Sequence, residues 1–516
     1  MITETNHTTR PLDHPAAGEG RPPAAPAGAA ARRVARNSVV PLAATLGARA
    51  MSMLLAAVMA RTLGAEGTGA YAVAVNLWLY ASIVSDFGLG TWLTREVARA
   101  PDADGVRQTV GEALALRLFL SAAAVPSLVA AGVLAGYVQS GTVDGRLVAT
   151  VLLLGAGLLP GAISATGTSL FNAHERMTFP ALVQLITAAL TTAGGIAVLL
   201  LGFDMVALAW VSLAVNLATA AVFAVASARS YFPLGLAVRP LRQLAVARDS
   251  LPLMLNGLLN NVFFRFDVQV LQSKGSAVVG YYANAYKVID AAGALPSSFV
   301  LALFPLLARR AAEATGGPAS AAGGGLARLY GLALKLLLAM ALPLAVLVTV
   351  TADGLIWLFL GPSFLPHSAI ALRVLIWFLP LSCFNGLTQY VLIALGRQRW
   401  ITLAFAVAAV FNVVANLVLI PHFSYLAAAA VTIATELVLL VPFLIGLHRR
   451  LEVAPLLLEA VRPLPAAAGA GLVLWWLVPL SAPLAFLAAG LLYPLLLYLS
   501  GAFDPAERRL LATFWR

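Results

Sequence analysis

Apolar runs long enough to cross a lipid bilayer recur along almost the whole chain, and they restrict its fold more than any other feature. A membrane-crossing helix needs about 20 apolar residues, and runs this long do not alternate as outer-membrane strands do. The composition agrees, since 61% of the 516 residues are hydrophobic and 11% are charged, against about 45–50% and about 25% in soluble proteins. We therefore predict an all-α integral membrane protein with about 14 transmembrane helices. The predicted spans are 39–60, 69–90, 112–136, 147–171, 180–202, 205–227, 250–271, 278–306, 328–350, 370–394, 400–420, 424–447, 464–480 and 483–500.

Basic residues are distributed unevenly between the two sides that these spans define. If the N-terminus is cytoplasmic, 24 Arg residues lie in the tails and loops of that side, whereas Arg61, Arg146 and Lys274 lie on the other. This bias follows the positive-inside rule. We therefore expect a multi-pass protein of the bacterial cytoplasmic (inner) membrane with both termini in the cytoplasm. The same pattern accounts for the net charge of +11 without a nucleic-acid partner.

The two halves of the chain resemble each other weakly. Residues 69–75 (GAYAVAV) align with 280–286 (GYYANAY), and residues 173–179 (AHERMTF) align with 394–400 (ALGRQRW) at nearly the same offset. An even number of spans per repeat predicts two parallel six-helix lobes related by an axis along the membrane normal. The predicted parts are a disordered cytoplasmic tail (1–36), an N-terminal lobe (37–248), a C-terminal lobe (249–450), and two extra transmembrane helices with a short cytoplasmic tail (451–516).

Residues 250–306 form two neighbouring spans that carry four charged side chains. An ionised side chain at mid-bilayer costs roughly 2.5–3.5 kcal/mol even on lenient insertion scales, so these four need partners, water or a polar substrate. Arg265 and Asp267 point to different faces of one helix and need partners on other helices or in a cavity. Lys287 and Asp290 are three residues apart and can pair on one face. Such a pair either clips helices together or lines a passage.

Three further charges lie in other spans. Arg49 lies about mid-depth in the first span, with no acid nearby on its own helix, so we expect it to face a central cavity. Glu436 lies in the twelfth span, and Asp86 near the end of the second, where an interfacial cap and a cavity residue are equal alternatives. The candidate substrate-binding cations are Arg49, Arg265 and Lys287. The candidates for ion coupling or charge balance are Asp267, Asp290, Glu436 and Asp86.

Three other basic residues lie nearer the predicted membrane boundaries. Arg117, Lys335 and Arg373 are within about two turns of a span end. Long basic side chains in such positions usually extend to the interface and place the charge in water. We expect these three to do so.

Motifs of soluble enzymes are missing from the sequence, which excludes several classes of function. There is no G-x-x-x-x-G-K-[ST] phosphate loop, and the six His residues include no i, i+4 pair. Residues 86–89 (DFGL) have the letters of a kinase motif but lie at the end of a membrane span. Cys383 is the only cysteine, so a disulfide framework is excluded. We expect no cofactor, no bound metal and no enzymatic activity.

Several motifs, in their order and spacing, give the chain a family resemblance. Residues 61–71 (RTLGAEGTGAY) and 85–89 (SDFGL) resemble the opening of polysaccharide-biosynthesis flippases, the Wzx-type family of O-antigen and exopolysaccharide flippases. This family belongs to the multidrug/oligosaccharidyl-lipid/polysaccharide exporter superfamily. The resemblance extends over nearly the whole chain from about residue 37. Its later motifs are 266–272 (FDVQVLQ), 279–287 (VGYYANAYK), 304–308 (FPLLA), 360–364 (LGPSF) and 395–399 (LGRQR).

This resemblance implies a fold, a substrate class and a mechanism. Members have two six-helix lobes around a central cavity and work by alternating access. The implied substrate is an oligosaccharide repeat unit linked to undecaprenyl pyrophosphate, moved from the cytoplasmic to the outer leaflet. The implied partners are this polyprenyl-pyrophosphate-linked oligosaccharide, membrane lipids, H⁺ or Na⁺ as a coupling ion, and a polysaccharide polymerase with its chain-length regulator. Arg49, Arg265 and Lys287 match cationic cavity positions of such proteins.

Two other functions remain open from the sequence. An ion-coupled multidrug or metabolite extruder of the same superfamily has the same fold, and the mixture of acids and bases in the spans does not exclude it. A membrane polysaccharide polymerase or ligase is also multispan and basic. Such enzymes usually need a large outer loop, which this chain lacks under the predicted topology.

Overall fold

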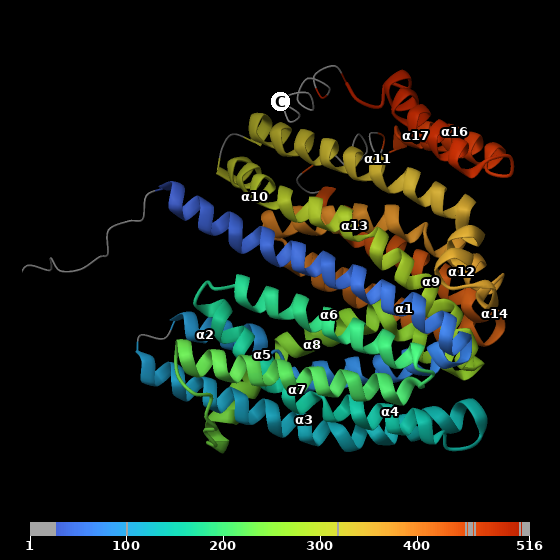
Figure 1. Cartoon of the computed structure of the whole chain (residues 1–516). Coiled ribbons are helices and arrows are strands. Elements are labelled where there is room, and N and C mark those ends of the chain that lie inside the picture. Colours follow the sequence, from blue (N-terminus) through green and yellow to red (C-terminus); the bar gives the residue numbers. More distant parts are fainter. Residues whose placement is uncertain are drawn as a thin grey trace, which may run out of the picture.

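Helices form every regular element in the described part of the chain. The computed structural model describes residues 27–99, 102–316, 319–448, 451, 458, 461–504 and 507, and no β-strand occurs among them (Figure 1). Helices are the expected element because hydrocarbon offers no hydrogen-bond partners to the backbone. The predicted all-α class is confirmed.

The first six predicted spans coincide with helices of the first half. Spans one and two lie in one long helix, α1, which is broken at Gly64 (φ 66°), in the gap predicted between them. A glycine suits this turn because the left-handed region is costly for other residues. The helices are α1 (Ala27–Asp86), α2 (Leu89–Arg99), α3 (Ala103–Ser140), α4 (Gly145–Ala156), α5 (Leu158–Ala173), α6 (Thr178–Leu200) and α7 (Met205–Ser230).

The beginning of α1 corrects the predicted N-terminal tail. Residues 1–26 lie outside the described residues, but α1 already begins at Ala27. Residues 27–36, which were predicted to be disordered, are therefore helical. The segment is rich in Ala and Arg, which favour helix, and it leads directly into the first span.

The other eight predicted spans coincide with helices of the second half. Spans eleven and twelve share helix α14, which is broken at Ser424 (φ 55°), the first residue of the predicted twelfth span. The helices are α8 (Pro240–Leu271), the 3₁₀ turn η1 (Gln272–Lys274), α9 (Ser276–Ala292), α10 (Ala294–Gly316), α11 (Ala319–Phe359), the 3₁₀ turn η2 (Pro362–Phe364), α12 (His367–Leu375), α13 (Phe378–Ala394), α14 (Gln398–His448), α16 (Leu464–Leu477) and α17 (Ala482–Leu499).

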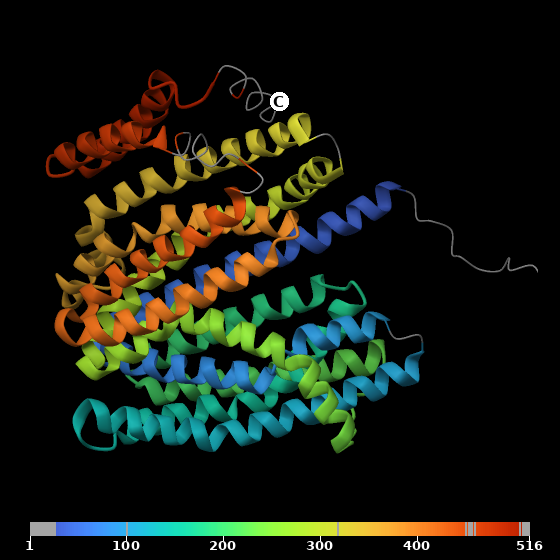
Figure 2. The same ribbon diagram turned by 180° about the vertical axis from the view of Figure 1, so that it is seen from behind.

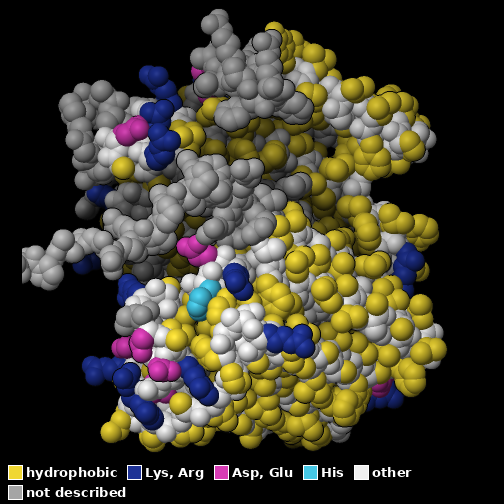
Figure 3. Space-filling model, turned by 60° about the vertical axis from the view of Figure 1, so that its left-hand side comes forward, with side chains coloured by type: hydrophobic (Ala, Val, Ile, Leu, Met, Phe, Trp, Pro, Cys, Tyr) yellow, Lys and Arg dark blue, Asp and Glu magenta, His cyan; other side chains and the backbone are white. Residues whose placement is uncertain are grey.

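The surface is that of a multi-pass membrane protein. Nine helical stretches in the described residues are long and apolar enough to cross a membrane. Helices α8, α9 and α10 are not among them, and α8 and α9 carry the four charges of residues 250–306. Hydrophobic side chains cover the flank of the molecule, whereas most of the visible Lys and Arg side chains gather at the end where α1 begins (Figure 3). A belt of exposed Leu, Val and Trp side chains is stable only against lipid.

Most helices of the two halves lie on opposite sides of the first part of α1, whereas α8 lies beside the helices of the first half. In Figures 1 and 2, α3 to α7 lie on one side and α10 to α13 on the other, with α16 and α17 outermost. This arrangement agrees with two lobes and two added helices. The lobe boundaries at residues 248 and 450 remain predictions.

The two halves approach each other very closely where α1 crosses α9. A Cβ atom added to Gly69 would lie 1.7 Å from the main-chain oxygen of Ser276, and one added to Gly280 would lie 2.0 Å from that of Ala65. These two glycines are the ones that the repeat alignment superimposes. Backbones can approach this closely only at small residues. The crossing therefore joins two positions that the sequence alignment of the halves superimposes, near the turn at Gly64.

Candidate functional site

The three predicted cavity cations line one common cavity. Arg49 comes from α1, Arg265 from α8 and Lys287 from α9, and together with Asp290 they line a space of about 290 Å³. We call it the charged cavity. It holds three basic side chains against one carboxylate, so it attracts anions.

Asp290 contacts two of these cations. Its carboxylate lies 3.2 Å from the Arg265 guanidinium, and its main-chain oxygen accepts a hydrogen bond of 3.3 Å from Arg49. The alternative that Asp290 pairs with Lys287 is wrong. A base placed before an acid on a helix is the weaker order for such a pair, and Arg265 reaches the carboxylate from the neighbouring helix instead.

Lys287 is the cation of the charged cavity that has no partner among the described residues. Its ammonium group forms no hydrogen bond or ion pair with any described residue, although its side chain lies in the cavity wall. A partly buried ammonium group without a counter-charge is costly. It therefore favours an anion in the space beside it.

A second cavity adjoins the charged cavity and shares Arg49 and Asp290 with it. Its volume is about 360 Å³, and its other lining residues come from α9, α10 and α13. We call it the aromatic cavity, because the rings of Tyr286, Phe378 and Tyr390 line it. The Arg265 guanidinium lies 5.0 Å from the ring centre of Tyr286, a cation–π distance, so this tyrosine links the two spaces.

Two of the predicted acids lie in the packed interior of the second half and line neither cavity. Asp267 is 3% exposed, and its carboxylate accepts hydrogen bonds from the Tyr282 hydroxyl and from the main-chain N–H of Val268. Glu436 is 2% exposed and accepts a hydrogen bond of 2.5 Å from the Asn385 amide. Both carboxylates thus have hydrogen-bond donors on the helices around them, as buried polar groups require.

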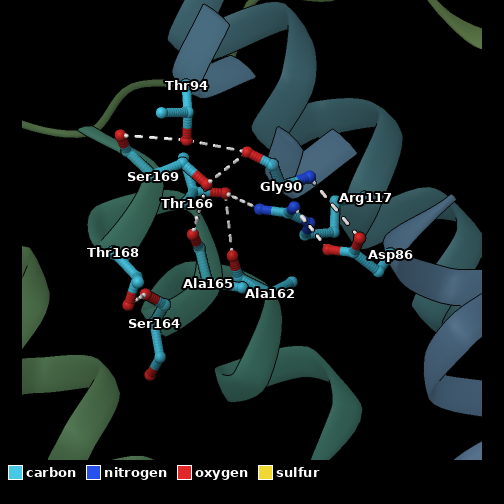
Figure 4. Close-up of polar contacts among 10 residues, drawn as sticks. All are labelled: Asp86, Gly90, Thr94, Arg117, Ala162, Ser164, Ala165, Thr166, Thr168 and Ser169. Carbon is cyan, nitrogen blue, oxygen red and sulfur yellow. Dashed lines mark hydrogen bonds and ion pairs between the residues drawn. The ribbon is translucent and has the colours of Figure 1, made fainter. Parts of the chain in front are cut away.

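The last predicted acid, Asp86, belongs to a separate polar cluster in the first half (Figure 4). Its carboxylate lies 2.5 Å from the guanidinium of Arg117 on α3. Arg117 also donates a hydrogen bond of 2.8 Å to the hydroxyl of Thr166 on α5. Asp86 ends α1 just before two left-handed residues, Phe87 and Gly88, and this turn brings the carboxylate to α3. The cluster ties three helices and lies outside both cavities.

Arg117 and Lys335 do not extend to the interface, so that expectation is wrong for both. Each is 1% exposed. Arg117 has its counter-charge in Asp86, and Lys335 has both oxygens of Glu507 at 2.9 Å. In each case a carboxylate compensates the buried charge. Asp86 at the end of α1 does so for Arg117, and Glu507 in the segment after α17 does so for Lys335. Arg373, which is partly exposed, pairs with Asp353 on α11.

Metal ligands are not gathered in the described part of the molecule. No group of three or more His, Cys, Asp or Glu side chains lies close enough there to hold a metal ion. The side chains that line the two cavities offer fixed cations, one carboxylate, hydroxyls, one thiol and aromatic rings.

The sequence model of the family described as "Polysaccharide biosynthesis protein" matches residues 34–310. The chain belongs to this family. The family expected from the sequence motifs is thereby confirmed. No curated protein matches the sequence significantly.

Solved structures define the fold. The lipid II flippase MurJ in an inward closed conformation is 12% identical, with a TM-score of 0.72 over 89% of this chain and 98% of its own. An inward-facing multidrug resistance MATE family transporter of the MOP superfamily is 16% identical, with a TM-score of 0.61 over 79% and 95%. A MOP superfamily transporter from Pyrococcus furiosus is 16% identical, with a TM-score of 0.51 over 81% and 95%. The protein thus has the fold of this transporter superfamily.

Several cavity residues were not predicted. Tyr286, Ser382, Gly386 and Tyr390 line the aromatic cavity, but hydroxyl and glycine residues are common in membrane helices and usually serve helix packing. Tyr286 carried a signal, because it lies one residue before Lys287 in the motif at 279–287. The residues of α13 carried none that a single sequence provides.

Proposed function

We propose that the protein is a flippase for lipid-linked oligosaccharides, which moves an undecaprenyl-pyrophosphate-linked repeat unit from the cytoplasmic to the outer leaflet. The observation that carries this proposal is the charged cavity, in which Arg49, Arg265 and Lys287 surround one space. Family membership supports the link to polysaccharide synthesis. The shared fold supports a transport mechanism.

Such a cavity has the properties that a diphosphate needs inside a membrane. An ionised phosphate group cannot enter hydrocarbon unaided, because desolvation is too costly. Arg and Lys side chains replace its hydration with charge-assisted hydrogen bonds, and guanidinium groups can bind phosphate oxygens in pairs. The polyprenyl tail needs no such shelter and stays in lipid.

The contacts between the two halves support alternating access. Arg49 comes from the first repeat, whereas Arg265 and Lys287 come from the second, so the charged cavity changes shape when the halves move. The crossing of Gly69 and Gly280 joins the halves near the turn at Gly64, away from the end where α1 begins. Rocking around such a contact exposes a central site to each side in turn. A drug extruder of this fold needs an anionic site for cationic drugs, and the surplus of bases here disfavours that alternative.

The proposal is tested with Arg49→Ala, Arg265→Ala and Lys287→Ala, each assayed for flipping of undecaprenyl pyrophosphate bearing one sugar in proteoliposomes. Each variant is expected to lose at least about tenfold in rate, equivalent to about 1.4 kcal/mol. Arg146→Ala, at an arginine in the first turn of α4 with a 77% exposed side chain, is the matched control and should keep the wild-type rate. Full activity of all three cavity variants at equal protein levels would rule out the cationic cavity.

A further inference from the structure

The lining of the aromatic cavity differs in kind from that of the charged cavity. Apart from Arg49 and Asp290, which both cavities share at their junction, no other charged side chain among the described residues lines it. The rest of its wall consists of aromatic rings, aliphatic side chains, the thiol of Cys383, two glycines and three hydroxyl groups. A second anion has no counter-charge in this wall, and a neutral polar group fits it better.

The three hydroxyl groups have unused hydrogen-bonding capacity. Tyr286, Ser382 and Tyr390 line the cavity, and none of their hydroxyls bonds to another described residue. Buried tyrosines elsewhere in the second half are paired, Tyr282 with Asp267 and Tyr330 with Thr388 at 2.7 Å. Tyr286 is buried and Ser382 and Tyr390 are half-buried, and hydroxyl groups shielded from water normally find partners. The cavity lining therefore calls for a ligand or water that both donates and accepts hydrogen bonds.

The rings favour a ligand with an apolar face as well. The aromatic faces of Tyr286, Phe378 and Tyr390 offer flat apolar area, and the tyrosines add polar tips. A pyranose ring has this dual character, because its C–H bonds form an apolar face and its hydroxyls lie around the rim. Neither a free anion nor a hydrocarbon chain matches both parts of the lining.

We propose that the aromatic cavity is a sugar subsite, which receives the sugar nearest the diphosphate while the diphosphate lies among Arg49, Arg265 and Lys287. The inference rests on the proposed function, and it adds which part of the substrate the aromatic cavity binds. The two cavities meet at Arg49 and Asp290, so adjacent groups of one molecule occupy both. Tyr286, which contacts Arg265 and lines the aromatic cavity, lies at the junction of sugar and diphosphate.

Gly386 sets the size of this subsite. A Cβ atom at Gly386 would have no atom within 4 Å, and Gly386 lines the aromatic cavity, so a larger side chain extends into it without displacing the packed helices. Gly386→Leu therefore fills the sugar subsite and leaves the charged cavity as it is. Gly354→Leu on α11 is the matched control, because this helical glycine also has open space around its Cβ position and lines neither cavity.

The experiment compares two probes on the purified full-length protein in nanodiscs. One probe is undecaprenyl pyrophosphate, and the other is the same lipid bearing one N-acetylglucosamine. Wild type and the Gly354→Leu control are expected to bind the sugar-bearing lipid about tenfold more tightly, about 1.4 kcal/mol. Gly386→Leu is expected to lose this preference while its affinity for the bare lipid stays within about twofold. Tyr390→Phe, which keeps the ring and removes one hydroxyl, is expected to reduce the preference for the sugar-bearing lipid several-fold.

The outcomes separate this inference from the proposed function. Equal binding of both probes by wild type, with loss of both in Arg49→Ala, overturns the sugar subsite and leaves the flippase proposal standing. A preference that survives unchanged in both Gly386→Leu and Tyr390→Phe also overturns it. If wild type binds neither lipid, the proposed function fails, and the inference fails with it.

Discussion

The guanidinium of Arg265 lies 3.2 Å from the carboxylate of Asp290, across a cavity to which both side chains are open, at 34% and 47% exposure. Ion pairs of this accessibility contribute only about 0–1 kcal/mol. Under the proposed function, the diphosphate of the substrate therefore displaces the carboxylate from Arg265 at little cost. Asp290 offsets one of the three positive charges of the cavity, and under the proposed function it competes with the substrate for Arg265.

This competition predicts that Asp290→Asn binds undecaprenyl pyrophosphate more tightly than wild type. Loss of a competitor worth up to about 1 kcal/mol raises affinity by up to about fivefold. The affinity is measured by titration in nanodiscs. Asp353→Asn, which removes the partner of Arg373 outside both cavities, should leave it unchanged. Weaker binding by Asp290→Asn would instead mean that the carboxylate orients Arg265 for the substrate.

The crossing of α1 and α9 predicts a strong effect of a single methyl group. Gly69→Ala places a Cβ atom 1.7 Å from the Ser276 main-chain oxygen, so the two backbones must separate. Overpacking of this kind costs typically about 1–3 kcal/mol. We expect a lower Tm for Gly69→Ala in detergent, measured by thermal unfolding. Gly161→Ala, with nothing within 4 Å of its Cβ position, is the matched control. An unchanged Tm for Gly69→Ala would show that the crossing is looser than the structure has it.

Much of the fold follows from the sequence because lipid allows few solutions. Apolar runs of about 20 residues must be helices, and the breaks at Gly64 and Ser424 lie at or next to the gaps between predicted spans. The repeat alignment superimposes Gly69 and Gly280, but their contact at the crossing of α1 and α9 was not predicted from it. The three cations that were proposed as cavity residues, Arg49, Arg265 and Lys287, line one space.

The partners of these charges could not be read from the sequence, because they depend on helix rotation and on local breaks. Lys287 precedes Asp290 on one helix, yet Asp290 pairs with Arg265 from another. The burial of Arg117 depends on the turn after Asp86, which brings a carboxylate to α3. The expectation that basic side chains near a span end extend to the interface does not take such a partner into account. Gly386 and Tyr390 become recognisable as cavity residues only when α13 has been packed against α9 and α10.

The Asp86–Arg117 pair predicts unequal effects of removing its two members, because the Arg117 side chain is 2% exposed and that of Asp86 is 41% exposed. Asp86→Ala leaves a buried guanidinium with Thr166 as its remaining side-chain partner. We expect this variant to lose about 3 kcal/mol, the lower end for a broken buried pair, because water reaches the site from the Asp86 side. Arg117→Met leaves a half-exposed carboxylate that water can solvate, so its cost should stay within about 1 kcal/mol. Thermal unfolding in detergent measures both, with the double variant expected to resemble Arg117→Met. Equal losses for the two single variants would contradict the difference in burial on which this prediction depends.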